Sequence, residues 1–250
     1  MSSGRTMRVT FSWDDGHPHD LRIAELMARH GICGNFYCPI TNREGLPVMS
    51  PEDMRQLVAM PGMEIGAHTY SHAYATRLPL KEWAEDTQRG KDALEDILAR
   101  EVPTFCYPGG KYSNDHVAAI EQMGFRYGRT TGNFSFSAAT HPLTVPTTLQ
   151  FYPHSTAVLA RNYTRHFRNH MGSRTAFALM AAPSFAERLQ ILLDSCRPES
   201  DQLLHLWGHS WEIMDANLLG PLEDTFRKLR ERLPASAFVT NLASLDASAP

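Results

Sequence analysis

Short segments with the apolar pattern of β-strands alternate with helical segments along most of the chain, and this alternation constrains its fold most strongly. The strand-like segments are residues 7–13, 34–39, 63–67, 104–107, 125–128, 143–145, 203–207 and 237–240. Helical spacing or capping signals mark residues 21–29, 50–62, 80–100, 113–123, 184–196 and 221–233. Repeated strand-then-helix units form a parallel sheet covered by helices. The sequence therefore predicts an α/β fold, a distorted (β/α) barrel of about seven parallel strands.

The composition is that of one globular domain. Hydrophobic residues make up 42% of the chain and charged residues 20%, which excludes disordered, collagen-like and coiled-coil classes. No linker-like stretch divides the chain, so we expect a single barrel domain over residues 1–250. Residues 130–183 are rich in Thr, Phe, Tyr, His and Arg and lack a clear strand–helix pattern. We expect them to be an insertion that decorates the mouth of the barrel.

Charge and cysteine content limit the partners and the compartment. A net charge of −3 offers no surplus of basic residues for a phosphate backbone, so nucleic acid is not an expected partner. No apolar run approaches the ~18 residues of a membrane span, and no signal-peptide pattern is visible at the N-terminus. The four cysteines form no CxxC pair. We expect a reduced, cytoplasmic protein, and its oligomeric state stays open.

Three polar clusters follow the ends of strand-like segments. They are residues 14–16 (DDG), 68–72 (HTYSH) and 206–212 (LWGHSWE). In parallel α/β folds the carboxyl ends of the strands meet at one face, where active sites are built. We therefore expect the three clusters to converge at one end of the barrel.

Histidine is abundant, with twelve residues, and three pairs have a spacing of four: His68/His72, His166/His170 and His205/His209. This spacing places two imidazoles on one face of a helical turn, where both can reach one metal ion. A single pair is a weak signal, because roughly one is expected by chance. The arginine-rich surroundings of His166/His170 favour a solvated helix face. His68/His72 follows a strand that ends in small residues, which favours a metal site.

The pair Asp14-Asp15 has two interpretations. Asp-Asp-Gly is common turn chemistry, and Asp15 can cap the following helix. Two histidines and one carboxylate are also the ligand set of a catalytic zinc or similar divalent ion, with one position open for water. A second carboxylate beside such an ion can take a proton from that water. One aspartate would then bind metal and the other would act as general base.

At these residues the chain resembles the polysaccharide deacetylases (carbohydrate esterase family 4, the nodulation-factor deacetylase homology domain). Residues 10–16 (TFSWDDG) resemble the first motif of that family, and residues 68–72 resemble its second motif, H-[ST]-x-x-H. Residues 34–37 (GNFY) resemble the intervening strand. The resemblance extends from about residue 7 to residue 112 and returns at residues 203–212.

The resemblance implies a role for each matching residue. Asp15, His68 and His72 would hold the metal, and Asp14 would be the general base. The last motif of the family, an apolar strand that ends in histidine, matches residues 203–209. His209 is the predicted general acid because it lies at the end of this segment. His205 lies earlier and is expected to be packed or to support the site from behind.

The third motif of the family, R-x-P-Y, departs from its usual form here. Cys106 stands where arginine is usual and Gly109 where tyrosine is usual, while Pro108 remains. The backbone N–H of Gly109 can still donate to an oxyanion, because a backbone donor does not depend on its side chain. Arg129 is a candidate to replace the missing arginine as partner of the base. The fourth motif of the family, with its Asp and Trp, is not visible.

Aromatic residues accompany these motifs. Aromatic rings stack on sugar faces, although rings near a barrel mouth also form ordinary core. Cys106 lies inside a strand with no base beside it in sequence, so a buried filler is favoured over a nucleophile. The predicted substrate-binding residues are Tyr107, Pro108, Arg129, Trp207 and Trp211.

The predicted function is a metal-dependent amide hydrolase that removes the acetyl group from an N-acetylated sugar. The resemblance implies a divalent metal, zinc first, with cobalt, nickel, manganese and iron as alternatives. Because no signal peptide is visible, a small-molecule or carrier-linked N-acetyl sugar is the expected substrate. Two alternatives stay open: hydrolysis of other non-peptide C–N bonds in imides or ureides, and a non-catalytic carbohydrate-binding relative.

Overall fold

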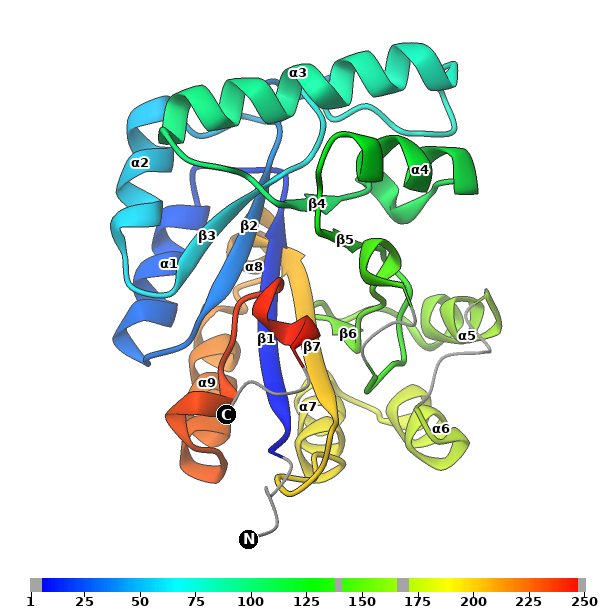
Figure 1. Ribbon diagram of the computed structural model, residues 1–250. Coiled ribbons are helices and arrows are strands. Elements are labelled where there is room, and N and C mark those ends of the chain that lie inside the picture. Colours follow the sequence, from blue (N-terminus) through cyan, green and yellow to red (C-terminus); the bar gives the residue numbers. More distant parts are fainter. Residues whose placement is uncertain (1–5, 138–140, 166–170, 247–250) are drawn as a thin grey trace, which may run out of the picture.

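The computed structural model describes residues 6–137, 141–165 and 171–246 and contains a curled seven-stranded sheet (Figure 1). All paired strands are parallel, in the order β5-β4-β3-β2-β1-β7-β6. The strands are β1 (Arg8–Asp14), β2 (Gly34–Cys38), β3 (Met63–Ala67), β4 (Thr104–Cys106), β5 (Tyr127–Arg129), β6 (Leu149–Gln150) and β7 (Leu203–His209). The predicted α/β fold is confirmed: the sheet is a distorted barrel with β5 and β6 as its edges.

Helices pack against the sheet, with α1 against β2 and both α2 and α3 against β3 (Figure 1). The helices are α1 (Asp20–Arg29), α2 (Pro51–Ala59), α3 (Leu80–Leu98), α4 (Asn114–Gln122), α5 (Thr156–Arg165), α6 (Ser173–Ala181), α7 (Phe185–Asp194), α8 (Ser210–Asp215) and α9 (Leu219–Arg232). Among the described residues, no helix is both long and apolar enough to cross a membrane.

The central strand β1 is buried on both faces, as expected for a covered parallel sheet. Its outward face packs on helices: Phe11 contacts Phe226 of α9 with ring centroids 5.0 Å apart, and Trp13 donates to the sulfur of Met27 in α1. Ser12 alternates with these residues, and its hydroxyl lies 2.8 Å from Nε2 of His205 inside the barrel. The next inward position along β1 is Asp14.

Two predicted strands are wrong. Residues 143–145 fall mostly in a 3₁₀ turn, Pro142–Thr144, and the edge strand β6 forms further on. Residues 237–240 follow another 3₁₀ turn, Ala235–Ala237, and only a single bridge joins Phe238 to Val9. Pro142 begins the first turn and Pro234 directly precedes the second, and the fixed φ and missing N–H of proline favour a turn over a strand.

Residues 130–183 contain more regular structure than the sequence suggested. The described part of this stretch includes β6, α5 and α6, and β6 pairs with β7. Helix α8 was not predicted either; it begins directly after β7. The pair His166/His170 lies outside the described residues.

Candidate active site

The register of the parallel sheet sets the floor of the site. Asp14 at the end of β1 is aligned with His209 at the end of β7, and Cys106 of β4 with Arg129 of β5. In aligned parallel strands, neighbouring residues point to the same face. His205 is aligned with Thr10, four residues before Asp14. His209 therefore reaches the layer of Asp14, whereas His205 stays deeper in the barrel.

His68 follows the end of β3 and is held in one orientation. Its Nδ1 lies 2.8 Å from the carbonyl oxygen of Cys106, so the ring donates there and its Nε2 keeps a free lone pair. Burial lowers the pKa of His68 to about 4, so this imidazole is neutral at pH 7. A neutral, oriented imidazole is what metal coordination requires.

The backbone leaves the direction of β1 at Asp15, the first residue after the strand. Its φ of 77° lies in the left-handed region, which aspartate tolerates better than most residues. Its Oδ2 accepts a hydrogen bond of 3.0 Å from Nε1 of Trp211, while Oδ1 faces the two histidines. Asp14 therefore lies inside the barrel, whereas Asp15 lies at its mouth.

The prediction that His68 and His72 share a face of a helical turn is wrong, although the two rings do meet. Thr69 and His72 have φ of 62° and 56°, which breaks any helix, yet the ring centroids lie 5.0 Å apart. Asp86 of α3 secures the loop by accepting from Ser71 Oγ at 2.7 Å. Gly90 of α3 permits the close approach, because a Cβ there would lie 2.6 Å from the backbone of Thr69.

Asp15, His68 and His72 can hold a metal ion. Oδ1 of Asp15 lies 3.3 Å from Nε2 of His72 and 3.9 Å from Nε2 of His68. The three ligand atoms lie within 4.8 Å of one another, and all three residues are buried. A tetrahedral ion with bonds of about 2.0–2.2 Å keeps its ligands about 3.3–3.6 Å apart. The observed separations fit such an ion after small side-chain adjustments.

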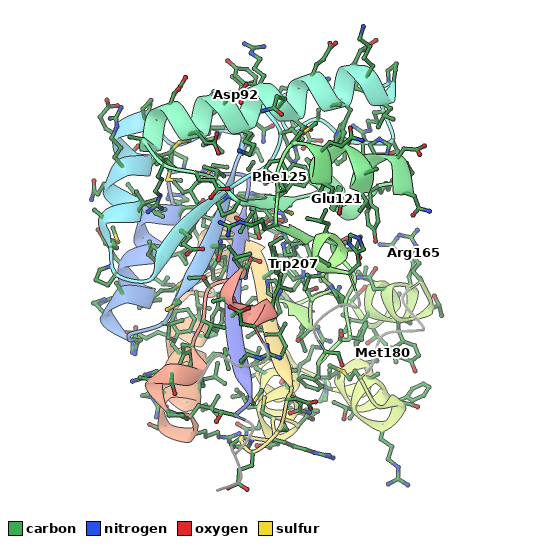
Figure 2. All side chains as sticks on the ribbon, in the orientation of Figure 1. Asp92, Glu121, Phe125, Arg165, Met180 and Trp207 are labelled. Atoms are coloured by element: carbon green, nitrogen blue, oxygen red, sulfur yellow. The ribbon has the colours of Figure 1, made fainter. Side chains whose placement is uncertain are left out.

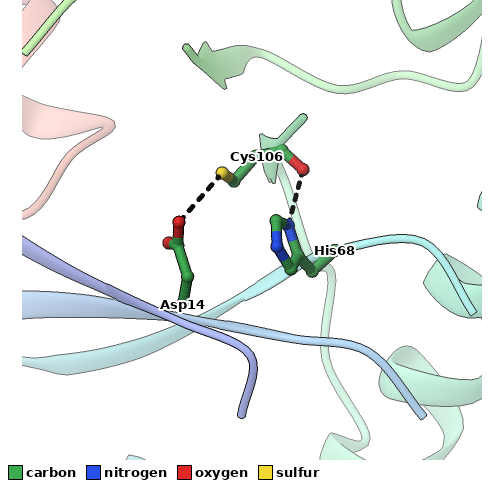
Figure 3. Close-up of side chains that lie close together, drawn as sticks. All are labelled: Asp14, His68 and Cys106. Carbon is green, nitrogen blue, oxygen red and sulfur yellow. Dashed lines mark hydrogen bonds between the residues drawn. The ribbon is translucent and has the colours of Figure 1, made fainter. Parts of the chain in front are cut away.

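A second possible ligand group, Asp14, His68 and Cys106, shares His68 with the first (Figure 3). Arg129 argues against a cation there, because its Nη2 contacts Asp14 and lies 2.9 Å from Sγ of Cys106. Burial also raises the pKa of the Cys106 thiol well above its usual value. The guanidinium already supplies the positive charge in this group, so we favour the site at Asp15.

Asp14 is ionised although it is almost fully buried. Burial raises the pKa of its carboxyl, but the charges of Arg129 and His209 and the hydrogen bond from Arg129 hold the pKa below its usual value. Nη2 of the fully buried Arg129 donates to both carboxylate oxygens. Arg129 of β5 thus makes the contact expected of the arginine missing at Cys106.

His209 carries a proton at neutral pH. Burial lowers the pKa of His209, but the hydrogen bond to Glu212 and the charges of Asp15 and Asp14 raise it to about 9. Nδ1 lies 2.7 Å from Oε2 of Glu212, which leaves the Nε2–H directed toward the cavity. By contrast, burial lowers the pKa of His205 well below its usual value, so His205 is a neutral, packed side chain.

These side chains open into one cavity of about 440 Å³. Eight predicted site residues line it: Asp14, Asp15, His68, His72, Gly109, Trp207, His209 and Trp211. Trp207, labelled in Figure 2, comes from the inner face of β7. Gly109 has a φ of 63°, and a Cβ there would lie 2.6 Å from the ring of Tyr74. Glycine at this position therefore permits both the turn and the close approach.

Three predicted substrate-binding residues do not line the cavity. Tyr107 is fully buried, and its hydroxyl donates to the carbonyl of Leu143 at 3.2 Å. Pro108 is buried at the start of a 3₁₀ turn. The guanidinium of Arg129 is hydrogen-bonded to the carboxylate of Asp14. All three residues are buried and none lines the cavity, so we correct their predicted role.

Several cavity residues were not predicted. Glu212 sits three residues after His209, a spacing that would have indicated contact had helix α8 been expected. Glu44 comes from a loop and lies 3.5 Å from Nδ1 of His72. The remaining unpredicted lining residues are Leu46, Tyr74, Thr131, Asn133, Gln150, His154, Val158, Arg161, Asn162 and Arg165. Most of these belong to residues 130–183, whose sequence carries no recognisable motif.

Comparison with known proteins matches residues 3–128 to a family model described as polysaccharide deacetylase. YxkH of Bacillus subtilis (strain 168), a polysaccharide deacetylase homologue, is 21% identical over 124 residues. The matched segment is 49% of this chain and 44% of YxkH. The chain thus spans less than half of the length of this curated relative.

Solved structures share the fold. Peptidoglycan deacetylase PdaC from Bacillus subtilis, solved as a mutant, has a TM-score of 0.59 at 14% identity, covering 98% of this chain and 92% of PdaC. A CE4 family pseudoenzyme from Bacillus anthracis has a TM-score of 0.56 at 15% identity, covering 95% of this chain and 64% of that protein. At such identities the likeness shows the fold alone, and this fold serves both an enzyme and a pseudoenzyme.

Proposed function

Because the chain belongs to the polysaccharide deacetylase family, we propose that it is a metal-dependent hydrolase that removes the acetyl group from an N-acetylated sugar. The observation that carries the proposal is the convergence of Asp15, His68 and His72, whose ligand atoms lie within 4.8 Å of one another. The pseudoenzyme shows that fold alone does not decide activity. An intact ligand set in a cavity favours an enzyme over a binding module.

Asp14 and His209 supply opposite proton chemistry in the same cavity. Asp14 has a lowered pKa and is a carboxylate, so it can accept the proton of an attacking water. His209, with a pKa of about 9, is protonated and can donate from Nε2 to the leaving nitrogen. Two titratable groups whose surroundings push their pKa values apart are typical of a general base and a general acid.

The oxyanion that develops on the acetyl carbonyl needs a donor in place before reaction. The backbone N–H of Gly109 is proposed as that donor, supported by its position in the cavity lining. A divalent cation held by Asp15, His68 and His72 would supply Lewis-acid polarisation of the carbonyl and acidify water. Trp207 and Trp211 offer ring faces on which a sugar can stack.

The identity of the metal and the compartment belong to the proposal. Two imidazoles and one carboxylate suit zinc, and also cobalt, nickel, manganese or iron. Cytoplasmic location stays a prediction, which fractionation of the producing cells would test. The proposed substrate is a small or carrier-linked N-acetyl sugar, with no nucleic acid partner.

The test is metal analysis of purified protein combined with release of acetate from N-acetylhexosamine derivatives. We expect one bound divalent ion per chain and acetate release that a chelator abolishes and the added metal restores. Parallel assays with a cyclic imide and a ureide separate the alternative C–N hydrolase. Turnover of those compounds without acetate release would overturn the proposal.

A further inference from the structure

We propose that the cavity also contains an anion-binding subsite, formed by Arg161 and Arg165 of α5, for a phosphate or carboxylate group carried by the sugar substrate. Both arginines line the same cavity as Asp15, His68 and His72. Arg165, labelled in Figure 2, is the last residue of α5. The inference rests on the proposed function, because it names the class of sugar that this cavity takes.

One face of α5 points into the cavity. The cavity-lining residues of this helix recur at intervals of three and four, which places them on a single face; they are Val158, Arg161, Asn162 and Arg165. Another face holds the helix to the protein: Leu159 is buried, and Tyr163 packs edge-on against Phe134 at 5.6 Å. The packing of α5 therefore turns the face that carries the two exposed arginines toward the cavity.

The start of α5 is fixed by buried contacts. Arg188 of α7 is buried and donates to the carbonyl oxygens of His154 at 2.9 Å and Leu179 at 3.1 Å. The hydroxyl of Thr156 donates to the carbonyl of Met180 at 3.1 Å. These bonds tie the beginning of α5 to the end of α6.

The two guanidinium groups have no acidic partner in the part of the chain that the structure describes. The cavity carboxylates are engaged elsewhere: Asp14 with Arg129, Asp15 with Trp211, Glu212 with His209, and Glu44 with Tyr74 and His72. Arginine groups elsewhere, such as Arg126 with Glu101, do have ion-pair partners. The cavity therefore has one positively charged wall whose balancing charge must come from solvent ions or from a ligand.

Arginine matches phosphate and carboxylate geometry through paired N–H donors, and two arginines one helical turn apart can share one anionic group. An uncharged sugar polymer would leave both groups unused. The cavity volume of about 440 Å³ lies within the range of small-molecule sites and has room for more than the acetyl group. The acetyl end would lie at Asp15 and the anionic end at α5.

Binding of sugars that lack an acetyl group tests the subsite apart from catalysis. We would titrate the metal-loaded protein with glucose 1-phosphate, glucuronic acid and methyl glucoside. We expect at least one of the two anionic probes to bind about tenfold or more tighter than the neutral probe, a ratio that falls with added salt. Preferred binding of glucose 1-phosphate would identify a phosphate subsite, and preferred binding of glucuronic acid a carboxylate subsite. Equal binding of all three probes would overturn the inference.

Variants Arg161→Gln and Arg165→Gln, singly and together, assign the binding to α5. Each substitution is expected to weaken binding of the preferred anionic probe about tenfold and to leave binding of methyl glucoside unchanged. Arg174→Gln on the exposed start of α6 is the matched control and should change nothing. Unchanged anion binding in the double variant, with its Tm intact, would also overturn the inference.

Kinetics separate this inference from the proposed function. With N-acetylglucosamine 1-phosphate and N-acetylglucosamine as substrates, the double variant should raise KM for the charged sugar alone and keep kcat. Acetate release without any preference for charge would refute the subsite and leave the deacetylase intact. Anion binding that depends on α5, without acetate release from any sugar, would support the subsite and refute the deacetylase.

Discussion

The substitution Glu212→Gln removes the negative charge that lies beside the ring of His209 and keeps nearly the same side-chain shape. The pKa of His209 is about 9 against an ordinary value of 6.5. The difference of about 2.5 units corresponds to about 3.4 kcal/mol, at 1.36 kcal/mol per unit. Glu212 is the first of the groups that raise this pKa, ahead of Asp15 and Asp14, and a hydrogen bond to a charged group contributes about 1.5 kcal/mol or more. The pKa of His209 should therefore fall by about 1–1.5 units in Glu212→Gln.

The assay is the pH dependence of kcat/KM for acetate release, with the ring of His209 titrated separately by NMR. The general acid must be protonated, so activity falls as pH rises through the pKa of His209. We expect the alkaline limb above pH 7 in the wild type and about 1–1.5 units lower in the variant. Glu223→Gln, which affects only the exposed pair with His30, is the control.

Stability changes in the same direction. Because the folded pKa of His209 lies above its unfolded value, its contribution to stability is complete below pH 6.5 and is lost as pH rises through about 9. Urea unfolding of the wild type should therefore show a decline over this window that is smaller in Glu212→Gln. An alkaline limb that stays in place in Glu212→Gln, with an unchanged NMR titration, would refute the assignment of Glu212.

Three further predictions concern the metal, the base and the acid. His72→Ala should lose bound metal and acetate release together, as measured by metal analysis; retained stoichiometric metal would contradict the ligand set. Asp14→Asn should keep metal and lose about 10²–10⁴-fold in kcat, and because Arg129 is left without its counter-charge it should also lose up to about 3–5 kcal/mol in urea unfolding. His209→Ala should lower kcat far more than His205→Ala, whose loss should appear in Tm; the reverse order would show that the deeper histidine is the acid.

The local sequence pattern was sufficient to predict those parts of the structure that depend on residues close together in the chain. The strand–helix alternation predicted the parallel sheet, and the clusters at residues 14–16, 68–72 and 206–212 do line one cavity. The left-handed conformations at Thr69 and His72 were not visible, since tertiary contacts from Asp86 and Gly90 stabilise them. The convergence of His68 and His72 was therefore predicted for the wrong local reason.

Substrate contacts were predicted least well. Tyr107 and Pro108 adjoin a motif in sequence, but both are buried where the chain leaves β4 for a 3₁₀ turn. Arg161 and Arg165 adjoin no motif, yet the packing of α5 directs them into the cavity. Proximity to a motif along the chain does not determine which way a side chain points, because direction depends on the element that carries it.

The amino-acid sequence by itself determined most of the alternation of strands and helices and the position of Asp14, Asp15, His68 and His209 at strand ends, since hydrophobic periodicity and turn residues are local properties. Only the tertiary structure decided that Arg129 pairs with Asp14, that Glu212 holds His209, and that α5 forms one wall of the cavity. Those contacts join segments through strand register and helix packing, and their free energy depends on burial and on neighbouring charge. Neither quantity exists until the chain is folded.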